Sequence, residues 1–150
     1  MAGVVVLLLA SSVACGALEV RRTEVTSAQR EACTSLVKAL PDRVSDQDRR
    51  ELSGNPLAAA WGDPAIVLRC GVPTPAGYDK FAGCQTVNGL DWFVPDEVSD
   101  DQGLDVVLTT IGREPQVELV VPAQYRPPVA AMVDLGAAIK AHTVVVRRCR

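Results

Sequence analysis

Hydrophobic residues recur at helical spacing near the start of the folded part of the chain. In segment 26–41, TSAQREACTSLVKALP, the residues that recur every three or four positions are Cys33, Leu36, Val37 and Leu40. This spacing predicts a helix that places Cys33 on its buried face. Thr26 or Ser27 caps its start, because either side-chain oxygen accepts a hydrogen bond from a free backbone N–H of the first turn. Pro41 ends it.

A second helix is predicted near the C-terminus, in segment 129–141, VAAMVDLGAAIKA. The residues expected near one face of this helix are Val129, Met132, Val133 and Ile139. The two helices therefore flank the middle of the chain, where the pattern of hydrophobic positions changes from helical spacing to alternation.

Alternation marks the strands between the helices. In AIVLRCGV, residues 65–72, Ile66, Leu68 and Cys70 fall on one face and Val67 and Arg69 on the other. Segments 104–112 and 116–122 are two further strands. Segment 84–94 contains Asn-Gly at positions 88 and 89 between two apolar runs, which predicts a hairpin because both turn positions need a positive φ.

The remaining segments are polar. DRVSDQDRRELSGN, residues 42–55, is charged and turn-like, with room for a short helix, and PTPAGYDKFAG, residues 73–83, is a loop. The acidic segment that contains Asp96, Glu97, Asp100 and Asp101 is expected to be a flexible loop, since it lacks the glycine-punctuated ligand spacing of a calcium loop. Helix, strands and helix follow in that order without βαβ alternation. This predicts an α+β fold, an antiparallel sheet of four to five short strands with both helices on one face.

The first 20 residues form a separate hydrophobic segment. Residues 2–18, AGVVVLLLASSVACGAL, carry no charge and reach the lower limit for crossing a bilayer. The segment is interpreted either as a cleaved signal or signal anchor, or as a lipoprotein signal with Cys15 lipidated. Val13-Ala14-Cys15 is similar to a lipoprotein cleavage site, although Ser12 stands where that pattern has a leucine-like residue.

The charges around this segment leave its orientation open. Arg21 and Arg22 follow it and no basic residue precedes it, so the positive-inside rule alone puts its C-terminal flank in the cytoplasm. The cysteines favour export instead. We therefore expect the natural start to lie upstream of Met1, with a basic region before the hydrophobic run. The predicted organisation is a signal or anchor at 1–20, a short tether at 21–28 and a single extracytoplasmic domain at 29–150.

Apart from Cys15, the chain has four dispersed cysteines, Cys33, Cys70, Cys84 and Cys149. An even number of cysteines without a C-x-x-C pair predicts two disulfides in an oxidising compartment and not a zinc site. The preferred pairing is Cys70–Cys84 across the proline-rich loop together with Cys33–Cys149. The alternative joins Cys33 to Cys70, because both lie on core-facing positions of helix and strand.

Several blocks of the chain resemble an uncharacterised family of actinobacterial envelope proteins, a domain of unknown function. The blocks are CTSLVKALP (33–41), AAAWGDPAIVLRCGVPTP (58–75), VNGLDWF (87–93), TTIGREPQVELVVPAQY (109–125), MVDLGAAI (132–139) and the closing CR. The resemblance implies a secreted or membrane-anchored protein. It implies no activity, ligand or catalytic residue.

Composition and charge exclude several function classes. The net charge of −3 and the pI near 5.1 give no electrostatic footprint for nucleic acid. The single histidine, His142, lies at the end of the second predicted helix, which disfavours histidine-dependent hydrolases. Arg69 and Arg113 are candidate anion ligands, but a solvated face is the preferred interpretation for both. No cofactor, metal or catalytic residue is predicted.

Two tryptophan–aspartate neighbourhoods are the candidate ligand-facing positions. Trp61 and Asp63 belong to the WGDP block, and Asp91 and Trp92 follow the predicted hairpin turn. If both met in space, two acids and two indoles would form a glycan-binding or glycosidase cleft. The simpler interpretation makes Trp61 a core residue and places Asp63 in a turn before Pro64.

The functional expectation is a non-catalytic binding or accessory module of the bacterial envelope. It is expected on the outer side of the cell membrane or secreted, held to the membrane by its N-terminal segment, with an envelope protein or wall polymer as partner. One alternative is a small glycan-acting enzyme that uses Asp63 and Asp91. The other is a structural subunit of a membrane assembly, which would expose an apolar patch on the sheet face away from the helices.

Overall fold

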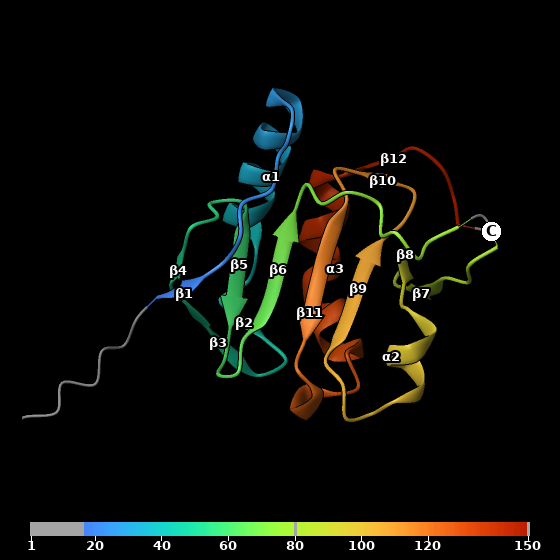
Figure 1. The fold of residues 1–150 in the computed structure, drawn as a ribbon. Helices are drawn as coiled ribbons and strands as arrows, with labels where there is room; N and C mark the ends of the chain where they lie inside the picture. Colours follow the sequence, from blue (N-terminus) through green and yellow to red (C-terminus); the bar gives the residue numbers. More distant parts are fainter. Residues whose placement is uncertain (1–16, 80, 150) are drawn as a thin grey trace, which may run out of the picture.

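One antiparallel sheet organises the domain (Figure 1). The computed structural model describes residues 17–79 and 81–149. In spatial order the strands are β2 (Arg43–Val44), β3 (Gln47–Arg50), β5 (Ala58–Trp61), β6 (Ile66–Cys70), β11 (Val117–Val121), β9 (Val106–Thr110), β8 (Leu90–Phe93) and β7 (Gln85–Val87). The α+β class is confirmed, but the sheet has eight strands and not four to five.

The two long helices are α1 (Ser27–Ala39) and α3 (Val129–His142), and they contact one another. Figure 1 shows α3 behind the central strands, with α1 beside β5 and projecting past its end. Cys33 and Leu36 of α1 join the same core cluster as Leu68 and Leu119 of the sheet. Thr26 caps α1, since its hydroxyl accepts the Gln29 N–H and the Gln29 side chain accepts the Thr26 N–H.

The buried face of α3 differs from the predicted one. Met132 and Ile139 are buried as expected, but Val129 and Val133 are 48% and 45% exposed. The buried residues of the helix are Ala131, Met132, Leu135, Gly136 and Ile139. The buried face includes the small residues Ala131 and Gly136, which let the helix approach the sheet closely. A Cβ on Gly136 would lie 3.8 Å from the Leu90 side chain of β8.

Segment 42–55 forms strands and not a helical piece. The hairpin β2–β3 turns at Ser45 and Asp46, both at positive φ, and β4 (Leu52–Ser53) follows. Alternation did not reveal these strands, because edge strands bury few side chains: Val44 is the one fully buried residue of β2 and β3. These two strands form because β3 pairs with β5 and β2 pairs with β3.

The hairpin predicted around Asn88-Gly89 is confirmed. β7 and β8 pair on either side of it, and Asn88 and Gly89 have φ of 50° and 77°. Between β8 and β9, the acidic segment forms a short helix, α2 (Asp96–Asp100), and not a loop. A 3-10 turn, η1 (Ala123–Tyr125), leads into α3.

The segment before α1 lies along the domain. β1 (Leu18–Glu19) pairs in parallel with β4, Arg22 Nε donates to the Gly54 carbonyl, and Thr23 Oγ1 donates to the Cys70 carbonyl. Residues 21–26, the larger part of the segment predicted to be a tether, are therefore attached to the sheet, and α1 begins at Ser27. We call residues 18–25 the strap.

Two disulfides form, but the preferred pairing is wrong. Cys33 bonds Cys70, which ties α1 to β6 in the core, and Cys84 bonds Cys149. The alternative pairing of Cys33 with Cys70 is correct because both sulfurs face the same core. Cys149 reaches the β7–β8 region because β12 (Val144–Val145) pairs with β10 (Arg113–Glu114) and directs the C-terminal segment there.

None of the helices among the described residues has the length and apolar character needed to cross a membrane. Cys15 and most of the predicted signal or anchor segment lie outside the described residues.

Candidate functional site

Neither tryptophan of the predicted site faces a ligand, because both side chains are fully buried. Trp61 Nε1 donates to the Pro41 carbonyl at 3.0 Å, and the Arg49 guanidinium lies 5.9 Å from the Trp61 ring. Trp92 packs in the same core cluster and its Nε1 has no hydrogen-bond partner. The indoles anchor the core at two strands, as the simpler interpretation proposed for Trp61.

The two candidate carboxylates lie on separate strands of the sheet, at opposite ends of the strands. Asp63 is in the turn between β5 and β6, with its side chain 92% exposed and 3.5 Å from Arg50. Asp91 is on β8, next to the far end of β9, and accepts hydrogen bonds from the Thr86 hydroxyl and the Cys149 N–H. Three strands, β6, β11 and β9, lie between β5, which precedes Asp63, and β8, which carries Asp91.

This separation overturns the idea of a joint catalytic pair. Three to four strand spacings of about 4.8 Å put the carboxylates about 14 to 19 Å apart across the sheet alone. Glycosidase carboxylates lie about 5 to 9.5 Å apart. Asp63 and Asp91 are therefore unable to act on one glycosidic bond.

A groove of about 780 Å³ lies on the open face of the sheet, the face away from α3 (Figure 1). Alternation along the strands creates it: the inward residues of each strand fill the core, so the outward residues of four neighbouring strands form the floor. The floor residues are Arg69 of β6, Glu118 of β11, Val107 and Thr109 of β9, and Phe93 of β8. The volume lies in the range of small-molecule sites. We call it the open-face groove.

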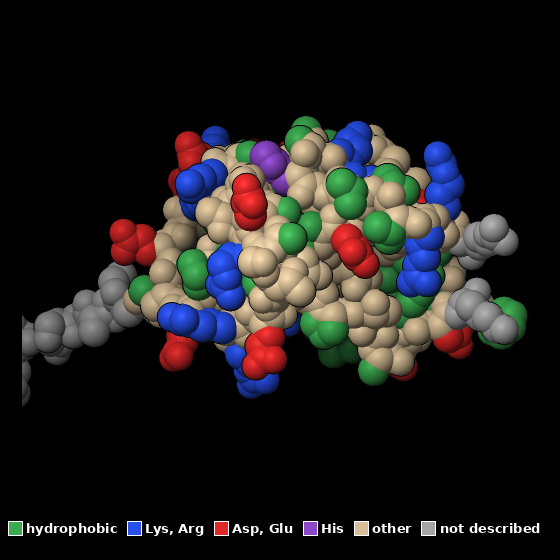
Figure 2. All heavy atoms as spheres, turned by 90° about the horizontal axis from the view of Figure 1, so that it is seen from above, with side chains coloured by type: hydrophobic (Ala, Val, Ile, Leu, Met, Phe, Trp, Pro, Cys, Tyr) green, Lys and Arg blue, Asp and Glu red, His purple; other side chains and the backbone are tan. Residues whose placement is uncertain are grey.

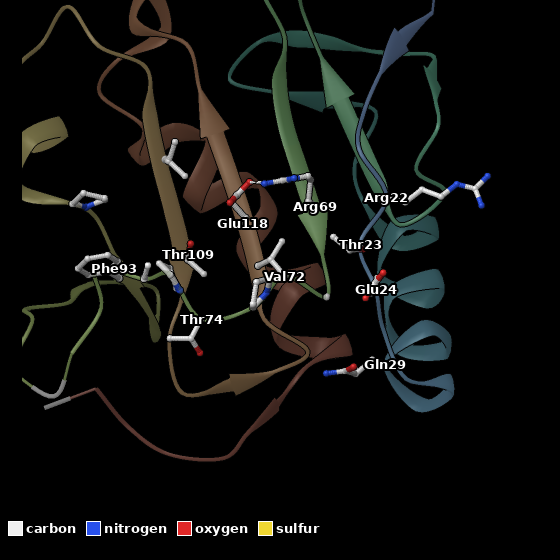
Figure 3. A pocket seen from close by; sticks show the side chains of 16 residues that line it. Arg22, Thr23, Glu24, Gln29, Arg69, Val72, Thr74, Phe93, Thr109 and Glu118 are labelled. Carbon is white, nitrogen blue, oxygen red and sulfur yellow. Dashed lines mark hydrogen bonds and ion pairs between the residues drawn. The ribbon is translucent and has the colours of Figure 1, made fainter.

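An ion pair occupies the middle of the floor. Arg69 Nε and Nη2 both donate to Glu118 Oε1, the first at 2.8 Å, and Figure 3 shows the two side chains meeting between β6 and β11. The two side chains are 29% and 15% exposed. Because both donors converge on Oε1, neither Arg69 Nη1 nor Glu118 Oε2 takes part in the pair, which leaves the N–H groups of Nη1 as donors and Oε2 as an acceptor.

The walls of the groove come from segments far apart in the sequence. One wall is the strap with Gln29 of α1, where Thr23 is fixed by its bond to the Cys70 carbonyl. Loop 71–76 crosses the sheet on the other side, and Thr74 donates to the Gln116 side chain. Figure 3 shows Phe93 beyond Thr74, at the opposite end of the groove from the strap.

The groove offers hydrogen bonding and no net charge. Its charged lining residues are Arg22 and Arg69, and Glu24 and Glu118, two of each sign. Its lining includes neither the histidine nor a cysteine, so the groove lacks the base and nucleophile pairs of hydrolases. Among the described residues no three His, Cys, Asp or Glu side chains cluster closely enough to hold a metal ion.

The sequence pointed to Asp63 and Asp91, whereas the pattern that marks the groove is a charged residue at an outward position of an apolar strand. Arg69 and Glu118 each place a charge at an outward position of an otherwise apolar strand, and they pair directly across β6 and β11. Arg113, for which a solvated face was preferred, is instead 9% exposed. Its guanidinium donates to Thr143 and to the Lys140 carbonyl.

On the open sheet face, three partly buried valines form a short apolar row across β6, β11 and β9, next to the Arg69–Glu118 pair. They are Val67, Val120 and Val107. The large hydrophobic side chains exposed among the described residues are elsewhere: Phe81, Leu104, Val129, Val133 and Val144–Val146. The face of the domain that is seen from above carries dispersed basic and acidic side chains (Figure 2).

Comparison with known proteins identifies a family but no characterised relative. Neither the curated proteins nor the solved structures contain a match to this chain. A family model described as a protein of unknown function, DUF3515, matches residues 1–146. Because the match covers nearly the whole sequence, this chain belongs to the DUF3515 family.

Proposed function

We propose that this protein is a non-catalytic binding module of the bacterial envelope and that its ligand lies in the open-face groove. The two disulfides indicate an oxidising, extracytoplasmic environment. The N-terminal segment attaches the domain to the membrane or directs its secretion. The strap that follows is attached to the sheet, so an anchored domain stays close to the membrane surface.

The paired charges of the groove floor carry this proposal. An anionic ligand would compete with Glu118 for Arg69, and a cationic ligand would compete with Arg69 for Glu118. Either would break a partly buried ion pair, which is costly. A neutral polar ligand instead bonds the free Nη1 and Oε2 atoms and leaves the pair intact. Hydroxyl groups suit this arrangement, because each both donates and accepts a hydrogen bond.

We therefore propose a neutral segment of a wall glycan as the ligand. Thr109, 2% exposed, lies on the floor beside the ion pair, and Phe93, 7% exposed, closes one end of the groove. The groove volume of about 780 Å³ accommodates a short run of sugar rings. The groove is also pre-formed, since the Cys33–Cys70 disulfide holds the end of β6 and Thr23 bonds the Cys70 carbonyl at its wall.

A titration with a neutral N-acetylglucosamine tetrasaccharide tests this proposal. The full chain with its disulfides formed is kept in a polyoxyethylene detergent, which carries neither sugar nor phosphate. We expect saturable NMR shifts at Thr109, Glu118 and the Arg69 Nε–H. Glu118→Gln should weaken binding about tenfold, the effect of losing one charge-assisted hydrogen bond. Asp63→Asn, at the other end of the strands, is the matched control.

The outcomes separate the candidates. Equal weakening by Asp63→Asn, or no saturable shift at millimolar sugar, contradicts the proposal. If a neutral extended peptide of similar length binds in the groove and the tetrasaccharide does not, the ligand is a partner protein and the glycan proposal is wrong. Location is tested separately: alkylation of intact cells without reductant should leave all four paired cysteines unlabelled.

A further inference from the structure

A guanidinium lies buried without an ion-pair partner near the C-terminal end of the chain. Arg113 is 9% exposed, and its hydrogen bonds go to the Thr143 hydroxyl and carbonyl, both at 2.7 Å, and to the Lys140 carbonyl at 3.2 Å. All of these acceptors are neutral. Among the described ion pairs none includes Arg113. A buried charge that forms no ion pair is costly, so this position favours further negative charge beside it.

A small cavity adjoins this guanidinium. Its volume is about 130 Å³, several times the share of one water molecule in the liquid, and it is much smaller than the open-face groove. Its polar lining residues are Thr86, Asp91, Arg113, Arg147 and Arg148. They come from β7, β8, β10 and the segment after β12, so only the folded chain brings them together.

Positive charge dominates the cavity, with three arginines against one carboxylate. The Arg147 guanidinium is held 5.6 Å from the ring of Tyr78. Burial lowers the pKa of Arg113, an effect that the charge of Asp91 opposes, and an anion in the cavity would act in the same direction as Asp91. These charges and this volume suit a small tetrahedral oxyanion.

The carboxylate determines which oxyanion fits. Asp91 already accepts hydrogen bonds from the Thr86 hydroxyl at 2.7 Å and from the Cys149 N–H at 3.2 Å, so its position is fixed. It repels an oxyanion without a proton, such as sulfate. Hydrogen phosphate carries a P–OH group that donates to a carboxylate oxygen, while its other oxygens accept from the arginines.

We propose that this cavity, formed by Asp91, Arg113, Arg147 and Arg148, is a binding site for inorganic phosphate. The site depends on the Cys84–Cys149 disulfide, because Arg147 and Arg148 lie on the segment that this bond holds. The Val146 and Arg147 N–H groups, which donate to the Gly112 carbonyl, position the same segment. The inference is independent of the glycan proposal, since the two sites share no lining residue.

The test is a pair of titrations of the full, oxidised chain in the same detergent, with sodium phosphate and with sodium sulfate at equal ionic strength. We expect saturable shifts of the Arg113 Nε–H and the Gly112 amide with phosphate, and affinity at least about tenfold weaker for sulfate. Arg147→Gln with Arg148→Gln should weaken phosphate binding about tenfold or more. Both residues are exposed, so this variant keeps the fold.

Two further variants make the result decisive. Asp91→Asn keeps a side-chain oxygen and removes the repulsion, so sulfate affinity should rise to within about threefold of phosphate affinity. Arg21→Gln with Arg30→Gln removes the same charge from exposed positions elsewhere and should leave phosphate binding unchanged. Equal affinity for the two anions in the parent chain overturns the proposal. So does unchanged binding in the Arg147, Arg148 variant, continued rejection of sulfate by Asp91→Asn, or the absence of saturable phosphate binding.

Discussion

Replacing Cys33 and Cys70 together with alanine should remove a large part of the stability of the domain. The disulfide closes a loop with a sequence separation of 37 residues. Loop-closure entropy for that length gives a stabilisation of about 4 kcal/mol through the unfolded state. Since small domains are stable by about 5–15 kcal/mol, the loss is a substantial fraction of the total.

The measurement is urea unfolding followed by tryptophan fluorescence, because both tryptophans are buried in the core that this disulfide crosses. With a slope of about 2 kcal/mol/M, a loss of about 4 kcal/mol lowers the midpoint by about 2 M. The matched variant replaces Cys84 and Cys149, which are separated by 65 residues. Loop length alone predicts at least as large a loss for this second pair.

We expect the second variant to lose about half as much or less. Val144–Val146 are exposed, so without the bond the C-terminal segment gains freedom in the folded state as well as in the unfolded state. The Cys33–Cys70 bond joins two fully buried residues and leaves no such freedom when it is removed. A midpoint shift below about 0.5 M for the Cys33, Cys70 variant, or a larger shift for the other, would refute this reasoning.

Three other substitutions test separate contacts by urea unfolding. Gly71→Ala should lower the free energy of unfolding more than Gly89→Ala. Both glycines have positive φ, but a Cβ at 71 would meet Val25 of the strap at 2.2 Å, whereas nothing lies within 4 Å of a Cβ at 89. Equal losses of stability would contradict the attachment of the strap. Trp61→Phe removes the hydrogen bond to a backbone carbonyl and should cost about 1–3 kcal/mol, and a neutral effect would be contrary to the packing. Asp63→Asn should change stability by less than about 0.5 kcal/mol, because this exposed ion pair is solvated, and a larger loss would give the turn a structural role.

The elements with strong local patterns were predictable. The helix at 26–41 follows from its spacing and cap, and the Asn88-Gly89 turn follows from the positive φ that both positions need. β6 alternates as predicted, with Ile66, Leu68 and Cys70 buried. In these segments local preference and tertiary packing agree, so the sequence alone is sufficient.

The edge of the sheet and the strap were not predictable in this way. Their order comes from pairing with other strands and from side-chain bonds to distant carbonyls, such as that of Thr23 to Cys70. Segment 42–55 has no alternation, because only one side chain of β2 and β3 is fully buried. The cysteine pairing failed for a related reason: the path of the C-terminal segment, and so the position of Cys149, depends on β10–β12 pairing.

The candidate site required the strand order. The sequence singled out Asp63 and Asp91 for their tryptophan neighbours, but in the sheet three to four strand spacings separate them. Arg69 and Glu118 become neighbours only because β6 pairs with β11, across 49 residues of sequence. A solvated face was the sensible expectation for Arg113, and its burial depends on the contact between β10 and the end of α3.

The central claim is that the open-face groove binds a neutral glycan segment while the Arg69–Glu118 pair stays intact. The most direct measurement is a structure of the oxidised chain with the N-acetylglucosamine tetrasaccharide. The account predicts sugar hydroxyls bonded to Arg69 Nη1 and Glu118 Oε2, with Arg69 still bonded to Glu118 Oε1. An empty groove at saturating sugar, or sugar bound elsewhere on the domain, would contradict it.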